Sequence, residues 1–283
     1  MASVESDKRL HVFLINLDVD RERLLRMQRL LDHIGLSYTR LPAYTQKTIP
    51  EWIRSQFYGS DGVPYGNLGD GEIGCYASHM EIMKRIIDDN IPDPILILED
   101  DLEFTPGFVS LLGGLTDLPM DWDIIRLSND PKSPFIPIKS IESNVELVTY
   151  WRIPNNTGAY LINRKGAEKF LRAFNPKTRA IDEDMRRPWF HHMITYGILP
   201  SPVTSNVLGT SNINIIGQVT SPRNYESVSI RYKNLFAGLF YKFRQFGPTL
   251  FFRILSQTIV ISIKRKFRDS DNNISSLRIN LDH

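Results

Sequence analysis

The feature that most constrains this fold is an unbroken apolar run, Ile95-Leu96-Ile97-Leu98, which leads directly into three acidic residues. A strand with one solvated face alternates apolar and polar side chains, so an uninterrupted run indicates a strand covered on both faces. Pro92 and Pro94 precede the run and favour an extended entry. We therefore predict an α/β fold in which residues 95–98 form a central strand.

The sequence before this run supplies a strand, a helix and a second strand. His11–Ile15 is a short apolar run, residues 21–34 carry a helical apolar stripe, and residues 38–41 again favour a strand. This order is typical of a layered α/β sheet. Residues 42–70, rich in glycine, are predicted to form a long surface loop, which is often a functional lid. Further predicted elements are helices at 72–89, 164–174 and 183–196, and strands at 122–127, 145–151, 159–162 and 203–207.

The composition is that of a globular protein in a reducing compartment. The chain has 283 residues, of which 42% are hydrophobic, enough for one large domain or two modest ones. We find no window of about 18 uncharged apolar residues and no signal peptide at the N-terminus. The single cysteine, Cys75, excludes an internal disulfide framework and a cysteine-cluster zinc site. We expect a cytoplasmic protein.

The formal net charge of +2 conceals an uneven distribution. Residues 229–268 contain nine Lys or Arg and no acid, whereas residues 1–228 hold more acids than bases. Aromatic and aliphatic residues accompany these bases, which indicates amphipathic helices, broken at Gly247-Pro248, that dock on an anionic membrane surface. The alternative is a pair of helices packed on the body. Nucleic-acid binding is disfavoured by the acidic body. We predict three parts: a body at 1–228, this basic segment at 229–268, and a flexible tail at 269–283.

The acids after the central strand, Glu99, Asp100 and Asp101, predict a cation site. Partly desolvated adjacent carboxylates require a positive partner, and ligands bind at the carboxyl ends of strands in open α/β sheets. Glu99 and Asp101 share one face of an extended backbone, and carboxylate oxygens suit Mg²⁺ or Mn²⁺, which can bridge a diphosphate. Asp100 then points the other way. The alternative is a solvated acidic turn before Thr105-Pro106.

Short motifs recur in a fixed order between about residues 10 and 210. They are Ile15-Asn16-Leu17 with Arg21 and Arg23, Gly71-Glu72-Ile73-Gly74-Cys75 with Ser78-His79, Leu98-Glu99-Asp100-Asp101, Asp121-Trp122-Asp123-Ile124-Ile125, Gly158-Ala159-Tyr160, and Ile181-Asp182-Glu183. As an ordered set they resemble glycosyltransferase family 25, the lipooligosaccharide and lipopolysaccharide glycosyltransferases whose domain also occurs in collagen galactosyltransferases. The resemblance implies a GT-A-like fold with a mostly parallel sheet, a UDP-hexose donor, Mn²⁺ or Mg²⁺ at the acidic motif, and inverting transfer.

The same resemblance implies a donor-binding role for several of these residues. Asn16, Leu17 and Arg21 look like the donor-side first loop, where Arg21 can neutralise a phosphate. Ser78 and His79 look like the family's helix motif facing the site, and Glu99 and Asp100 belong to the same donor and metal region. For His79 the alternative is a structural histidine with satisfied hydrogen bonds. We expect Cys75 to be a small packing residue.

Inverting transfer also needs a general base beside the acceptor hydroxyl. Asp182 matches the family pattern most directly, and Glu183 is the neighbouring candidate. Ordinary capping of a helix N-terminus by acids is the competing interpretation. His191 and His192, further along the predicted helix, either line an acceptor pocket or lie on the polar surface.

The sequence therefore predicts a metal-dependent inverting glycosyltransferase. It would move a hexose, galactose or glucose, from a UDP-sugar to a lipid-linked saccharide in bacterial lipopolysaccharide core synthesis, at the cytoplasmic face of the inner membrane. One alternative is a catalytically silent carbohydrate- or partner-binding module on the same fold. An NAD-linked enzyme is suggested only by Gly69–Gly74, which matches G-x-G-x-x-G without the apolar strand that should precede it.

Overall fold

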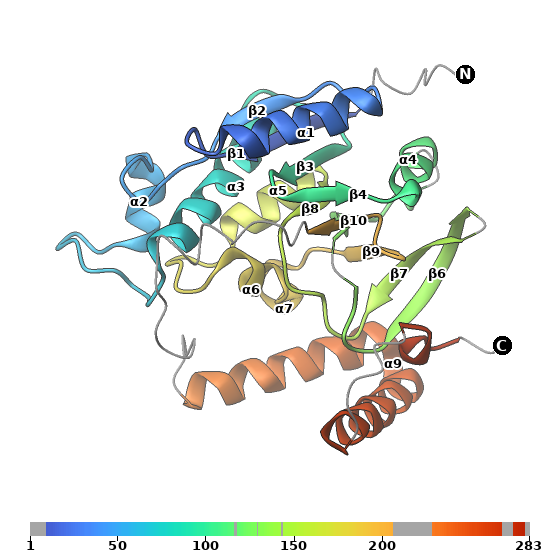
Figure 1. Cartoon of the computed structure of the whole chain (residues 1–283). Helices are drawn as coiled ribbons and strands as arrows, with labels where there is room; N and C mark the ends of the chain where they lie inside the picture. Colours follow the sequence, from blue (N-terminus) through green and yellow to red (C-terminus); the bar gives the residue numbers. More distant parts are fainter. Residues whose placement is uncertain are drawn as a thin grey trace.

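A computed structural model describes residues 10–115, 118–128, 130–142, 144–205, 228–267 and 274–280, which form an α/β body with a long C-terminal helical segment (Figure 1). The central sheet has eight strands. In spatial order they are β2 (Thr39–Pro42), β1 (His11–Asn16), β3 (Ile95–Glu99), β8 (Ala159–Ile162), β5 (Ile124–Arg126), β9 (Thr195–Leu199), β7 (Val145–Tyr150) and β6 (Phe135–Glu142). A small antiparallel sheet pairs β4 (Leu102–Phe104) with β10 (Val203–Ser205). The helices are α1 (Arg21–His33), α2 (Glu51–Phe57), α3 (Asp70–Asp88), α4 (Pro106–Gly113), α5 (Arg164–Arg172), α6 (Ile181–Met185), α7 (Pro188–His191) and α9 (Val228–Phe267).

Most strands of the large sheet point in one direction. β1 is parallel to β2 and β3, and β5 is parallel to β9. Only β8 and β7 run against both of their neighbours, so the other six of the eight strands share one direction. The predicted α/β class and mostly parallel sheet are confirmed.

The apolar run that predicted a central strand is fully buried in β3. Ile95 and Ile97 pack on one face with residues of α3 and α5, while Leu96 and Leu98 pack on the other with residues of α1 and α4. Each such side chain contributes about 1.5–3 kcal/mol of burial free energy relative to exposure. Burial on both faces explains why polar residues do not alternate with apolar ones in this strand. It also fixes the edge of the sheet where the acids follow the strand.

Two predicted elements are wrong. The predicted loop at 42–70 contains α2, because Ile49, Ile53 and Phe57 recur every four residues and are buried in the core. The predicted helix at 183–196 is divided into α6, α7 and the start of β9. Pro188 begins a new helix, and His192 ends it in the left-handed conformation with φ 55°. The glycine content of residues 42–70 predicted a loop, although the four-residue spacing of the apolar side chains indicates a helix.

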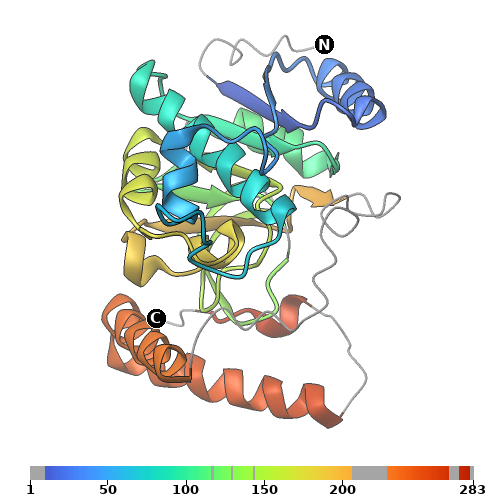
Figure 2. The same cartoon turned by 90° about the vertical axis from the view of Figure 1, so that its left-hand side faces the viewer.

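The C-terminal segment lies along one side of the body in both views (Figures 1 and 2). Gly247 has φ 71° and divides α9 into two helices, as the Gly-Pro pair predicted. Phe251 and Ile254 are buried against Trp151, so this face of α9 packs on the body. Residues 229–263 are nevertheless long and apolar enough to cross a membrane by length and composition alone, although Arg253 interrupts the run.

Residues 274–280, within the predicted flexible tail, are packed on the body. Leu277 and Ile279 are buried, and Arg278 forms two contacts of 2.5 and 2.8 Å with the Glu146 carboxylate. Residues 206–207, at the end of the predicted strand 203–207, lie outside the described residues. So do the other residues of 206–227 and residues 268–273, which adjoin the predicted boundaries at 228 and 268. The division into 1–228, 229–268 and 269–283 stays a prediction.

His191 supports the turn between α7 and β9. It is buried, its Nε2–H donates to the Met185 carbonyl at 3.2 Å, and its Nδ1 accepts from the Met193 amide at 3.0 Å. Burial lowers the pKa of His191 to about 4. A proton on Nδ1 would point at the Met193 N–H group. The ring therefore fits this site in its neutral form, with its proton on Nε2. The exposed His192 beside it does not share this burial.

Acid should therefore destabilise the protein through His191. Between pH 6.5 and about 4 the unfolded state binds a proton that the folded state excludes, so this contribution is present above pH 6.5 and decreases as the pH falls. We expect His191→Phe to reduce the loss of unfolding free energy between pH 7 and pH 5 by about 2 kcal/mol relative to wild type, as measured by urea unfolding. His192→Asn, which suits the left-handed backbone, should keep the wild-type pH dependence; an unchanged dependence in His191→Phe would contradict the assignment.

Candidate functional site

A cleft of about 340 Å³ opens where β1 and β3 end. These strands are parallel neighbours with Ile15 opposite Glu99, so the residues that follow each strand meet at one edge of the sheet. The start of α3 and the loop at 43–47 form other parts of the wall. Of the predicted site residues, Asn16, Leu17, Ser78, His79, Glu99, Asp100 and Asp101 line the cleft.

Asp100 links the ends of β1 and β3. Its carboxylate accepts hydrogen bonds from Asn16 Nδ2 at 2.7 Å and Arg23 Nη1 at 3.2 Å. Burial raises the pKa of Asp100, and the contacts with Asn16 and Arg23 oppose that shift. The Asn16 oxygen in turn accepts from Arg40 Nε at 3.1 Å. These contacts exclude a merely solvated acidic turn.

Glu99 is held by two hydrogen-bond donors. Its Oε1 atom lies 3.2 Å from His79 Nε2 and accepts from Thr157 Oγ1 at 2.6 Å. Burial alone would raise the pKa of Glu99, but the hydrogen bonds from His79 and Thr157 leave the pKa below its ordinary value. An ionised carboxylate only accepts, so His79 Nε2 donates to Glu99, and His79 Nδ1 forms a hydrogen bond of 2.9 Å with the Tyr160 hydroxyl. This geometry favours a positioning role for His79, whose two ring nitrogens both have partners.

Asp101 completes the acidic cluster without such partners. Among the described residues no side chain donates a hydrogen bond to its carboxylate. Its pKa is raised to about 6 by burial and by the negative charges of Glu99 and Asp100. An uncompensated carboxylate beside an ionised one is a fitting site for a hard divalent cation.

A second ligand group also lies at this cleft. Cys75, His79 and Glu99 have possible ligand atoms within 4.8 Å of one another. However, burial and the nearby Glu99 charge raise the pKa of the Cys75 thiol well above its ordinary value, so it stays protonated. His79 has no free ring nitrogen. The carboxylates of Glu99 and Asp101 are therefore the better donor set.

Ser78 and Gly74 seat the loop at 43–47 on α3. Ser78 Oγ donates to the Gly74 carbonyl and accepts from the Tyr44 amide, both at 2.8 Å. A Cβ atom on residue 74 would lie 2.3 Å from the Tyr44 carbonyl oxygen, so this approach requires glycine. Between α2 and α3 the structure has an isolated β-bridge, Tyr58 with Pro64, and no strand, so the G-x-G-x-x-G match at 69–74 does not directly follow a strand.

The structure places Arg21 away from the cleft and Arg23 at its wall. Arg21 is exposed and does not line the cleft, whereas Arg23 does and pairs with Asp100. The two arginines are separated by about 200° around α1, because each residue advances about 100°. Thr157, which donates to Glu99, was not among the residues predicted from the sequence. Its signal was weak, since nothing in the local pattern connects residue 157 with residue 99.

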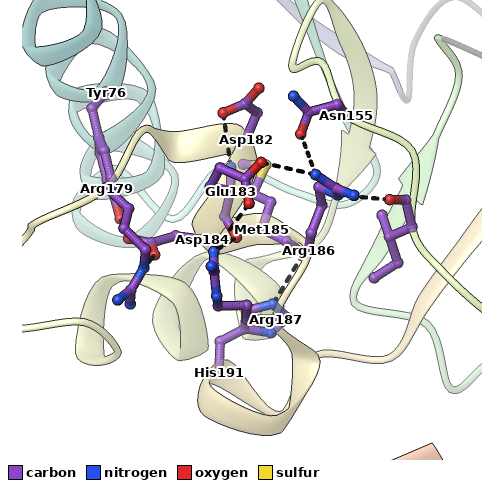
Figure 3. Close-up of polar contacts among 11 residues, drawn as sticks. Tyr76, Asn155, Arg179, Asp182, Glu183, Asp184, Met185, Arg186, Arg187 and His191 are labelled. Carbon is purple, nitrogen blue, oxygen red and sulfur yellow. Dashed lines mark hydrogen bonds and ion pairs between the residues drawn. The ribbon is translucent and has the colours of Figure 1, made fainter. Parts of the chain in front are cut away.

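The acids at 182–184 point in different directions (Figure 3). Asp182 lies in the first turn of α6 and accepts from the amide of the next residue, Glu183, at 2.8 Å, whereas no side chain caps this helix. Glu183 instead pairs with Arg186 at 2.9 Å and Arg187 at 3.3 Å. Each carboxylate oxygen of Glu183 therefore has an arginine partner.

Asp184 is fully buried, and its carboxylate accepts from the Tyr76 hydroxyl at 3.0 Å and from Arg179 at 2.7 Å. It belongs to the core. Asp182 differs from both neighbours, because its charge acts on Cys75, which lines the cleft and also senses Glu99 and Asp101. Of the three acids, Asp182 is the one associated electrostatically with the acidic cluster.

Comparisons with known proteins show the family of this chain. The profile of glycosyltransferase family 25 (LPS biosynthesis protein) matches residues 9–185. The chain is 32% identical over 179 residues to procollagen galactosyltransferase 1-A of Xenopus laevis, covering 57% of this chain and 28% of that protein. It is 30% identical over 192 residues to a glycosyltransferase 25 family member of Anopheles gambiae, covering 61% and 30%. The chain thus spans under a third of the length of these relatives.

A solved structure of a fruit-fly galactosyltransferase 7 mutant with manganese, UDP-Gal and xylobiose is similar at a TM-score of 0.38 and 10% identity, over 80% of this chain and 79% of that one.

Proposed function

Since the chain belongs to glycosyltransferase family 25, we propose that it transfers a hexose, galactose or glucose, from a UDP-sugar to a saccharide acceptor with inversion. The observation that carries the proposal is the pair of carboxylates at the end of β3. Glu99 is held ionised and Asp101 is left uncompensated, in a cleft large enough for a small ligand. The named activity of the procollagen galactosyltransferases supports a hexose.

In this proposal the donor lies in the cleft and a divalent ion, Mn²⁺ or Mg²⁺, is held by Glu99 and Asp101. When bound, such an ion would stabilise the charge of the departing diphosphate. His79 and Thr157 fix the Glu99 carboxylate through Oε1, which leaves Oε2 without a hydrogen-bond partner among the described residues. Asn16 and Leu17, at the end of β1, form the wall against which we place the nucleotide.

We assign the general base to Asp182. An inverting transfer needs a carboxylate that takes the proton of the acceptor hydroxyl while the diphosphate leaves from the opposite face of the sugar. Arg126 is fully buried beside this region, and its charge acts on both Asp182 and Glu99. Its Nε and Nη2 atoms have no hydrogen-bond partner in the described chain. Arg126 therefore supplies positive charge between the proposed base and the proposed metal ligand.

The acceptor is the part on which the comparisons differ. The family description names LPS biosynthesis, whereas the animal relatives are named procollagen galactosyltransferases. We propose a lipid-linked saccharide, because α9 presents exposed Tyr232, Phe236 and Phe240 beside its basic residues, as a helix at a membrane surface does. We extend the proposal to bacterial LPS core synthesis at the cytoplasmic face of the inner membrane, for which the family description is the support. The alternative of a silent carbohydrate-binding module predicts no turnover.

Metal binding is tested at Asp101. Calorimetric titration with UDP should show affinity that increases when Mn²⁺ is present, and Asp101→Asn should remove most of this increase, about tenfold or more, because the ion loses a charged ligand. Asp88→Asn, at the exposed end of α3, should behave like wild type. UDP binding that does not depend on metal in the wild-type protein would favour the silent module.

Proton transfer is tested at Asp182. Asp182→Asn should reduce turnover by about 10²–10⁴-fold and leave UDP affinity in the presence of Mn²⁺ nearly unchanged, because the base acts on the acceptor and not on the donor. Turnover is measured as UDP release under saturating donor. Glu51→Gln, an exposed acid of α2, is the matched control. Wild-type turnover in Asp182→Asn would remove this residue from the mechanism.

Membrane docking is tested on the outer face of α9. Replacing both Phe236 and Phe240 by serine should weaken co-sedimentation with anionic vesicles about tenfold, because two exposed aromatic side chains would no longer enter the interface. Leu25→Ser removes a similarly exposed apolar side chain from α1 and should have no effect. Equal sedimentation of all three proteins would exclude docking through this face.

A further inference from the structure

A second cavity system lies between the body and α9, and the proposed transfer leaves it without a role. Two adjoining hollows of about 270 and 750 Å³ share the lining residues Trp151, Arg152, Ile153, Arg186 and Lys242. The first three follow β7, Arg186 follows α6, and Lys242 belongs to α9. The cavity exists only because α9 packs on the body.

The lining is strongly cationic. Around the smaller hollow the described residues contribute five positive side chains and one negative, Glu183; the positive ones are Arg152, Arg186, Arg187, Arg231 and Lys242. Burial, together with the charges of Arg152 and Arg186, lowers the pKa of Lys242 to about 8. Like charges gathered at a partly buried site oppose folding unless an anion offsets them.

Hydrogen-bond donors without partners lie in the same wall. Trp189 Nε1, Asn234 Nδ2 and Thr195 Oγ1 are buried and have no hydrogen-bond partner among the described residues. The first two are N–H groups and can only donate. An unmade buried hydrogen bond costs about 1–3 kcal/mol, so such donors indicate a missing acceptor. Lys242 Nζ also lies 4.5 Å from the centre of the Trp151 ring, which orients the ammonium group.

The cavity adjoins the proposed base. Glu183 and Arg186, which line it, form the ion pair drawn in Figure 3, while the preceding residue, Asp182, acts electrostatically on Cys75 in the donor cleft. One step along α6 therefore separates the acid assigned to the acceptor hydroxyl from the wall of the cationic cavity. Asp182 lines neither hollow, so an acceptor whose phosphate is held there must extend past Glu183 to bring its hydroxyl to Asp182.

We propose that this cavity binds a phosphate or diphosphate group of the acceptor. Guanidinium and ammonium groups with N–H donors recognise phosphate oxygens by charge-assisted hydrogen bonds. The anion site itself stands on the cavity's own residues, whereas its assignment to the acceptor rests on the proposed function. A lipid anchor and a phosphorylated sugar offer the same phosphate chemistry, and the experiment below distinguishes them.

The test is a titration of the full chain with inorganic pyrophosphate in metal-free buffer, with and without excess UDP. We expect binding that UDP does not displace and that Arg152→Gln and Lys242→Met each weaken about tenfold, because each removes one charge from the shared wall. Arg152 is exposed, so its replacement should leave the thermal unfolding midpoint unchanged. Arg172→Gln, an arginine of α5 that is 79% exposed and remote from the cavity lining, is the matched control.

Two further arms identify the source of the phosphate. Competition by glucose 1-phosphate would support a phosphorylated sugar, and competition only by vesicles rich in phosphatidic acid would support a lipid phosphate. Absence of pyrophosphate binding, equal binding by the variants and wild type, or displacement by UDP alone would overturn the anion site. Failure of sugar transfer with pyrophosphate binding intact would overturn only the assignment to the acceptor.

Discussion

Compensation of three adjacent carboxylates at the end of β3 is the constraint on which the site depends. A buried strand delivers Glu99, Asp100 and Asp101 to one sheet edge, where their mutual repulsion must be offset. Asn16 and Arg23 donate hydrogen bonds to Asp100, and His79 and Thr157 donate hydrogen bonds to Glu99. These contacts draw β1, α1, α3 and the segment before β8 to the same edge. In the described chain, Asp101 and the second carboxylate oxygen of Glu99 have no side-chain hydrogen-bond donor, so they remain for a ligand from outside the chain.

The three adjacent acids of α6 also have different partners, but they lie on a helix rather than at the end of a strand. Successive residues of a helix point about 100° apart, so Asp182, Glu183 and Asp184 reach three environments. Asp184 is fixed in the core by Tyr76 and Arg179, Glu183 is neutralised by two arginines, and Asp182 remains associated with the cleft. The two neighbours anchor this short helix, and in that way they position the acid to which we assign proton transfer.

The C-terminal helix adds a surface that the body lacks. Its inner face packs through Phe251 and Ile254 on Trp151, and its outer face leaves a row of aromatic side chains exposed. Between helix and body, positive side chains and unpaired donors face a hollow. The basic segment that the sequence predicted to bind a membrane therefore has two different faces, an exposed aromatic outer face and an inner face whose bases line a cavity against the body. Membrane docking and packing on the body, posed as alternatives by the sequence, are compatible in this arrangement.

Local patterns determined much of this protein. The apolar run at 95–98, the helical stripes at 21–34 and 72–89, and the Gly-Pro break in the basic segment each specify structure through neighbours in sequence, so they were predictable. The ordered motifs likewise identified seven residues that line the cleft. Tertiary structure alone decided which arginine of α1 reaches Asp100, that Thr157 fixes Glu99, and that Arg152, Arg186 and Lys242 share one cavity. Those contacts join residues far apart in the chain, and their energies depend on distances and burial that no local period encodes.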